Sequence, residues 1–290
     1  MNPSNQSLSK PSSNSRSGLT RVEVLVLSAV LAVLAGLLLM NLVRHAPPGP
    51  KRVSCMSNVK QLTTAWLSYA ADNQGQLMPN PGWVKGVMNW NPDNPDNTDF
   101  AQLLDPDKSL MAPYVHSVEI FKCPADDFTS QNFKERRVRS YSLNGVLAGP
   151  SGSGPTAQGK APRGRTYYGR NSQETEGPVR IAADLTPRPA MIFTFLCEHP
   201  DSLNDGGFLF DPGYPPGEER WRDLPSSHHP GPSCPIAFAD GHAEIHQWLE
   251  TRGTNRTVYP VTLTNVLPWL ARPAGTSRDY QWMQDRMPYL

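Results

Sequence analysis

Histidine side chains gather in one part of the sequence, and imidazole is a common metal ligand. Five of the seven histidines lie close together in the second half of the chain. His242, Glu244 and His246 alternate along a segment with a strand pattern, so their side chains would share one face. With His228 or His229 nearby, this set could hold zinc. The spacing matches no diagnostic zinc motif, and the alternative is a polar strand face with histidines hydrogen-bonded in loops.

A second group of candidate ligands lies in the segment that begins at Glu198 and ends in a glycine. Its oxygen ligands would be Glu198, Asp201, Asn204 and Asp205. Carboxylate and amide oxygens beside a glycine turn suit Ca²⁺, although the spacing is not that of an EF-hand. The sequence therefore suggests a structural calcium ion here, and favours it over the zinc site. The alternative is a turn whose carboxylates cap backbone N–H groups.

Signatures of catalysis are scarce. Ser226 and Ser227 precede His228 and His229, but a nucleophile needs its base across space rather than beside it in the chain. The sequence contains no G-x-S-x-G motif, no P-loop and no dinucleotide fingerprint. We therefore expect no enzymatic activity, with a membrane-anchored hydrolase as an alternative.

The overall composition indicates a folded protein that does not bind nucleic acid. Lys and Arg number 27 against 26 Asp and Glu, and no basic run exists to contact phosphates. The 30 prolines and 22 glycines stay below the share that indicates disorder. This composition predicts a loop-rich domain with few long helices.

The N-terminal region has the pattern of a membrane segment. Residues 1–17 are rich in Ser and cannot bury a face, whereas residues 24–43 carry no charge. At about 1.5 Å per residue, this apolar run matches a bilayer core of about 30 Å. It is too long for a cleaved secretory signal. A plain signal anchor would explain the length but not Glu23, because a carboxylate in hydrocarbon is costly.

The residues Gly18-Leu19-Thr20-Arg21-Val22-Glu23 resemble the processing site of type IV prepilins. The resemblance implies cleavage after Gly18 by a prepilin peptidase and methylation of the new N-terminus at Leu19. Glu23 would then be the fifth residue of the mature chain, where its carboxylate would pair with the N-terminal amine of a neighbouring subunit. The sequence departs from the family in having Leu19 where Phe is usual and Arg21 where an apolar residue is usual.

Further motifs extend this resemblance to large pilin-like proteins, including pseudopilins of type II secretion. One is the C-x-x-N-x-K-Q-L run that begins at Cys55, with apolar residues near helical spacing. Others are F-K-C-P-A-D-D at 121–127, R-V-R-S-Y-S-L-N-G at 137–145, and an element similar to H-x9-D-G. In that element, ten residues rather than nine separate His229 from Asp240.

Four cysteines offer disulfides if the head lies outside the cytoplasm. Three pairings are possible, and we favour Cys55–Cys123, which would tie the stalk helix to the head. Cys197–Cys234 would then join two strand regions. The alternative is four buried free thiols.

These observations predict an α+β fold, in which an N-terminal transmembrane and stalk helix packs on a loop-rich head with an antiparallel β-sheet. We expect a leader at 1–18, a transmembrane helix at 19–44, an amphipathic helix at 45–77 with a proline break at 47–50, and a head at 78–290. Residues 149–178 are expected to form a long loop, 190–197 a buried strand, and 235–248 a hairpin with a two-residue turn at Asp240-Gly241.

The expected function is that of a structural subunit in the bacterial inner membrane, with its head outside the cytoplasm. It would polymerise with other pilin-like subunits into a pseudopilus or pilus-like filament for secretion. The alternative is an uncut, non-polymerising membrane anchor whose head binds a glycan or another ligand.

Overall fold

A computed structural model of the chain describes residues 20–44, 49–78, 80, 82–129, 135–147, 157–161, 165–168, 182–185, 188–211, 220–267 and 277–288. The chain divides into two compact units, Met1–Pro48 and Gly49–Leu290. The boundary falls at the predicted proline break, so the amphipathic helix belongs to the same unit as the head.

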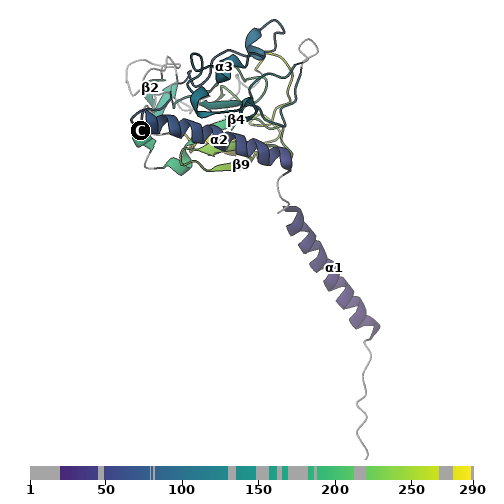
Figure 1. Cartoon of the computed structure of the whole chain (residues 1–290). Coiled ribbons are helices and arrows are strands. Elements are labelled where there is room, and N and C mark those ends of the chain that lie inside the picture. The colour runs from purple at the N-terminus through teal and green to yellow at the C-terminus, as the bar shows by residue number, and fades with distance from the viewer. Residues whose placement is uncertain are drawn as a thin grey trace, which may run out of the picture. The chain divides into compact units, whose positions relative to one another are not determined.

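The first unit contains helix α1, Arg21–Arg44 (Figure 1). Thr20 and Glu23 cap its first turn reciprocally. Glu23 Oε2 accepts hydrogen bonds from Thr20 N at 2.7 Å and from Thr20 Oγ1 at 2.9 Å, while Thr20 Oγ1 accepts one from Glu23 N at 3.3 Å. This is a capping box, and it fixes where the helix begins. Large apolar side chains along the helix, among them Leu25 and Val33, are exposed.

We find no helix in the described part of the chain that combines the length and the apolar character needed to cross a membrane. Side chains of α1 beyond Ala35 lie outside the described residues.

Helix α2, Pro50–Asp72, begins the second unit. Proline suits its first turn, where the missing N–H would have had no partner. Its buried residues recur with helical spacing, as the sequence predicts: Cys55, Val59, Leu62, Thr63, Ala65, Trp66 and Ala70. The helix ends at Asp72, five residues before the predicted boundary at 77. Asn73 is the C-cap, and Gly75, with φ +80°, donates its N–H to Ala70 O at 2.7 Å.

The head is built on a five-stranded sheet in the order β5-β1-β4-β8-β9. The strands are β1 Tyr141–Asn144, β4 Phe193–Cys197, β5 Gly207–Phe208, β8 Ser233–Phe238 and β9 Ala243–Gln247. Strands β1, β4, β8 and β9 pair antiparallel, but β5 pairs parallel to β1. The sheet is therefore mixed, which corrects the prediction of an antiparallel sheet.

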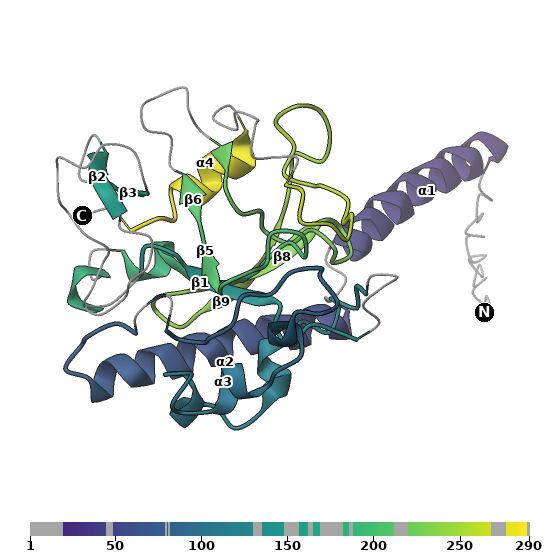
Figure 2. The same cartoon turned by 90° about the horizontal axis from the view of Figure 1, so that it is seen from above.

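Both faces of the central strands are covered. Every residue of β1, β4 and β8 is buried, in contrast to the alternation of a half-exposed sheet. Helix α2 runs along one face, and α4 (Arg278–Gln284) lies on the other side with β6 (Phe210–Asp211), as Figure 2 shows. Strand β7 (Arg220–Trp221) pairs with β6, and Tyr280 of α4 packs on Phe210 with ring centroids 4.7 Å apart.

Short elements complete the head. Helix α3 is Ala101–Leu104, and the 3₁₀ helices are η1 Pro95–Asn97, η2 Ala112–Tyr114, η3 Val118–Phe121, η4 Ala182–Leu185 and η5 Pro189–Met191. The segment predicted as a long loop contains the antiparallel pair β2 Ala157–Ala161 and β3 Arg165–Tyr168. The rest of that segment lies outside the described residues.

The predicted hairpin forms between β8 and β9, with a different turn. Phe238 O accepts the N–H of Gly241 at 2.9 Å, and Phe238 N donates to His242 O at 2.9 Å. Gly241 has φ +89°, whereas Asp240 is not among the residues with positive φ. A type I′ turn needs positive φ at both central residues. The connection is therefore a three-residue loop that ends in a left-handed glycine.

Candidate metal centre

Three cysteines and one histidine converge in the core of the head. One ligand atom from each of Cys55, Cys123, Cys197 and His229 lies within 4.8 Å of the others. The cysteines are 0% exposed and His229 is 2% exposed. Among the described residues, this is the one group of three or more His, Cys, Asp or Glu side chains with that geometry.

Each ligand comes from a different element. Cys55 projects from the buried face of α2, and Cys123 follows η3. Cys197 is the last residue of β4, where it pairs in register with Tyr141 of β1. His229 lies just before β8 and forms an isolated bridge with Ser233. The cluster therefore joins the helix, the η3 loop, the sheet and the β8 approach.

Hydrogen-bond donors point at two of the sulfur atoms. Tyr141 Oη donates to Cys55 Sγ at 3.1 Å, and the backbone N–H of Ala125 donates to Cys123 Sγ at 3.4 Å. Asn58, one helical turn after Cys55, donates to Tyr141 Oη at 3.3 Å and to Lys122 O at 3.0 Å. The C-x-x-N motif thus places a ligand and a positioning amide on one face of α2.

Two histidines adjoin the sulfurs. His229 Nε2 lies 3.3 Å from Cys123 Sγ, and His228 Nε2 lies 3.9 Å from Cys197 Sγ. The two rings stack with centroids 5.2 Å apart. In the described part of the chain, Nδ1 of each ring is buried without a hydrogen-bond partner.

The environment separates the three thiols by acidity. Burial raises the pKa of Cys55 and of Cys197 well above the usual value. Burial acts in the same direction on Cys123, but hydrogen bonds with Cys197, Cys55, His228 and His229 outweigh it and hold the Cys123 pKa far below its usual range. The three pKa values thus shift in different directions, with only that of Cys123 lowered.

This arrangement fits a structural zinc site. Around a tetrahedral zinc ion, with Zn–S of about 2.3 Å and Zn–N of about 2.0–2.1 Å, ligand atoms lie roughly 3.5–3.8 Å apart. The distances between the four ligand atoms would need to shorten by about 1 Å at most. Catalytic zinc sites keep an open position, whereas these ligands have no solvent exposure to speak of.

A catalytic thiol is the other chemistry that the Cys123–His229 contact suggests. Reactive cysteines are partly exposed, because a substrate must reach the sulfur. Cys123 is 0% exposed, so the contact is ill suited to nucleophilic catalysis.

The structure brings the predicted Cys55–Cys123 pair together without a bond between them. All four cysteines are free thiols in the structure. Cys234 is buried and donates its S–H to Cys197 O at 3.1 Å, but it is not a member of the four-ligand group. The disulfides stay predictions, and Cys197–Cys234 has only this backbone contact to support it.

The candidate calcium ligands accept hydrogen bonds from several different groups of the head. Glu198 Oε2 accepts a hydrogen bond from Ser142, and burial raises the Glu198 pKa to about 7. Asp201 accepts from Trp90 Nε1 at 2.9 Å and from Thr262 N at 2.7 Å. Asn204 Oδ1 and Asp205 Oδ1 cap the N–H groups of residues 205 and 207. These contacts match the alternative in which the oxygens stabilise turns, and a calcium ion there stays a prediction.

His242, just before β9, and His246 of β9 have aromatic partners and do not join a metal group in the described part of the chain. His242 stacks on Phe238 with centroids 4.3 Å apart, and its Nδ1 lies 2.5 Å from Asp240 Oδ1. His246 stacks on Trp282 of α4 at 3.6 Å. Of the predicted zinc ligands, His229 belongs to the four-ligand group, where its partners are cysteines, and His228 lies beside that group, 3.9 Å from Cys197 Sγ.

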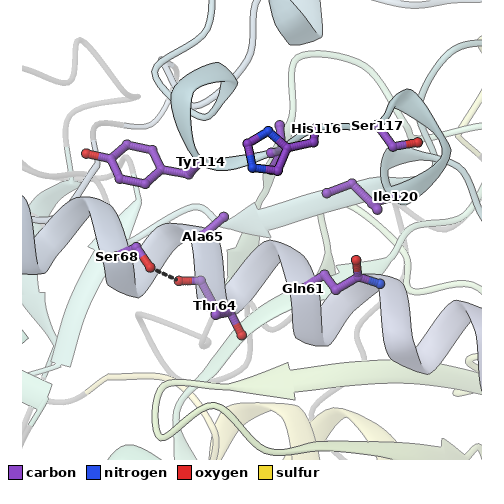
Figure 3. Close-up of a pocket in the computed structure, with 9 residues that line it drawn as sticks. Gln61, Thr64, Ala65, Ser68, Tyr114, His116, Ser117 and Ile120 are labelled. Carbon is purple, nitrogen blue, oxygen red and sulfur yellow. Dashed lines mark hydrogen bonds between the residues drawn. The ribbon is translucent and has the colours of Figure 1, made fainter.

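A groove of about 300 Å³ lies between α2 and the η2–η3 region (Figure 3). Its lining is Gln61, Thr64, Ala65, Ser68, Tyr114, Val115, His116, Ser117 and Ile120. No acidic side chain belongs to this lining, so His116 has no carboxylate partner there. The groove does not supply an acid–base pair.

Gly18 and Leu19, the predicted processing site, lie outside the described residues. Glu23 is exposed and engaged with Thr20, as described for α1. Comparisons with protein-family models, with curated proteins and with solved structures found no match.

The four-ligand group of Cys55, Cys123, Cys197 and His229 was not predicted from the sequence. Its ligands stand far apart in the sequence and lack the short paired spacing of familiar zinc motifs. A usable signal was present. Cys55, Cys123 and His229 each fall in a separate motif, C-x-x-N, F-K-C-P and the H-x9-D-G-like element, and Tyr141 falls in a fourth.

Proposed function

We propose that this protein is a structural pilin-like subunit, inserted in the bacterial inner membrane through residues 19–44 and polymerised into a pseudopilus or pilus-like filament. A prepilin peptidase would remove the leader after Gly18. The head would lie outside the cytoplasm and pack against other pilin-like subunits.

The observation that carries the proposal is the position of Glu23 at the start of an apolar helix that forms a unit apart from the head. Exposed apolar side chains along α1, from Val22 to Leu34, offer a surface for neighbouring helices or lipid. Because Leu19 lies one residue before the capping box, cleavage after Gly18 would leave the new amine next to the first turn of α1.

The capping box sharpens the test, because it gives Glu23 a role in any helix. Glu23→Gln keeps a residue that suits a capping box but removes the charge. Thr20→Ala keeps the charge and removes the hydroxyl, at a cost of about 1 kcal/mol to the helix start. If Glu23 pairs with the amine of a neighbouring subunit, Glu23→Gln loses assembly and Thr20→Ala keeps it.

The experiment is cross-linking of subunits in cells, with N-terminal sequencing of each variant in parallel. We expect wild-type protein to begin at Leu19, and both variants to be cleaved because the leader is unchanged. Wild-type-like oligomer ladders for Glu23→Gln would contradict the proposed pairing. A chain that begins at Met1 or Asn2 would favour the alternative, an uncut anchor with a ligand-binding head.

A further inference from the structure

We propose that Cys55, Cys123, Cys197 and His229 bind one zinc ion, which fastens α2 to the sheet of the head. The proposal concerns the folding of the head and does not depend on filament assembly. It assigns the ligand set to a thiophilic, four-coordinate divalent metal rather than to a disulfide.

The chemistry of the four ligands favours zinc. Three thiols and one imidazole are a common ligand set of structural zinc sites. Carboxylate oxygens, which magnesium and calcium prefer, do not belong to the group. The ligand atoms already lie within 4.8 Å of one another, so side-chain rotation could close the shell around an ion.

Neighbouring residues orient the sulfur atoms through hydrogen bonds. Metal-bound ligands are usually oriented by hydrogen bonds from outer residues. Tyr141 Oη and Ala125 N–H donate to Cys55 and Cys123, and Asn58 holds Tyr141 and the carbonyl of Lys122. Donors aimed at sulfur stabilise thiolates, the form that binds metal.

The cluster lies where four separate parts of the fold meet. The four ligands come from α2, the η3 loop, β4 and the segment before β8. A single disulfide would join two of these and leave a third buried thiol beside it. A metal ion joins all four, which suits a head rich in loops and short strands.

The test uses the full chain, purified in mild detergent with thiols kept reduced and without chelators. Elemental analysis should find one zinc per chain. After removal of zinc, Co²⁺ should give sulfur-to-cobalt charge-transfer absorption and the strong visible bands of tetrahedral coordination. A protein that holds no zinc and gives no such cobalt spectrum would overturn the proposal, and so would stoichiometric iron in place of zinc.

Variants locate the site. Cys55→Ser and His229→Ala should lose the metal, whereas His229→Cys should keep it through four sulfurs. Cys234→Ser is the matched control, because Cys234 is equally buried and adjacent to Cys197 but outside the group. It should retain one zinc. Equal loss of zinc from Cys234→Ser and Cys55→Ser would contradict the assignment.

Two measurements keep the test decisive if ligand variants fail to fold. Tyr141→Phe should keep one zinc and weaken its binding roughly 10–100-fold in competition with a chelator. Peptide mapping of freshly isolated wild-type protein should find Cys55 and Cys123 unbonded. A Cys55–Cys123 disulfide in that protein would overturn the zinc site and support the sequence-based pairing.

Discussion

Thr63 of α2 and Thr194 of β4 share a hydrogen bond of 2.7 Å between their hydroxyl groups, and both side chains are 0% exposed. The bond crosses the interface between helix and sheet in the apolar core. A buried hydroxyl without a partner is costly, so each threonine depends on the other. Substitutions at this pair therefore measure how much one contact between α2 and the sheet contributes to stability.

We expect Thr63→Val or Thr194→Val alone to lower the free energy of unfolding by about 1–3 kcal/mol, because each leaves one buried hydroxyl unpaired. The double variant should cost less than the sum of the two, since it removes both polar groups. Denaturant unfolding of the four proteins gives the coupling energy. Thr64→Val, on the exposed face of α2, is the control and should change stability by about 0.5 kcal/mol or less. Additive single effects would show that the hydrogen bond contributes nothing.

Gly206 is expected to reject a side chain for two reasons. Its φ is +91°, and a Cβ there would lie 3.0 Å from Trp83 Nε1 and 3.0 Å from Val84 Cγ2. Gly253 has a similar φ of +84° but nothing within 4 Å of a Cβ, so it is a matched control. Gly253→Ala should cost about 1–2 kcal/mol from backbone strain alone. Gly206→Ala should cost roughly 1–3 kcal/mol more from overpacking, measured as the difference in unfolding free energy. Equal costs would mean that Trp83 and Val84 move aside freely.

Local patterns predicted those elements that depend on neighbours in sequence. The helical spacing of Val59, Leu62 and Trp66 predicted the buried face of α2, and the apolar run before Cys197 predicted β4. The Asp240-Gly241 pair predicted the hairpin between β8 and β9, although not its turn type. These signals are reliable because side-chain period and glycine conformation act over a few residues.

Features that depend on contacts between distant parts of the chain were not predicted from the sequence. Strand β5 has two residues and no periodic pattern, yet its parallel pairing with β1 makes the sheet mixed. The cluster of Cys55, Cys123 and Cys197 arises because α2 packs against the end of β4 and the loop after η3, which are distant in sequence. Sequence reasoning paired the cysteines in twos, since a disulfide needs two sulfurs and nothing local indicated a third beside them.

His246 should make the stability of the head depend on pH. Burial lowers its pKa to about 4, with a further lowering from the nearby charge of Arg286. The His246 ring stacks on the Trp282 ring. The Arg286 guanidinium also lies over the Trp282 ring, 3.6 Å from its centroid. The folded state thus resists protonation of an imidazole that the unfolded chain protonates near pH 6.5.

The direction in which stability changes with pH follows from this difference in pKa. Below about pH 6.5 the unfolded chain binds a proton that the folded chain does not, so the stability that neutral His246 contributes is lost as pH falls toward 4. Between pH 7.5 and 5.5 we expect a loss of about 1 kcal/mol, after a discount for the partial exposure of the ring. His246→Phe keeps an aromatic ring on Trp282 and cannot titrate. The free energy of unfolding of the wild type should therefore fall relative to that of this variant as pH falls. Arg286→Gln should reduce the pH dependence by removing the neighbouring charge. Denaturant unfolding at several pH values measures all three proteins, and a constant difference between wild type and His246→Phe would show that His246 titrates alike in the folded and unfolded states.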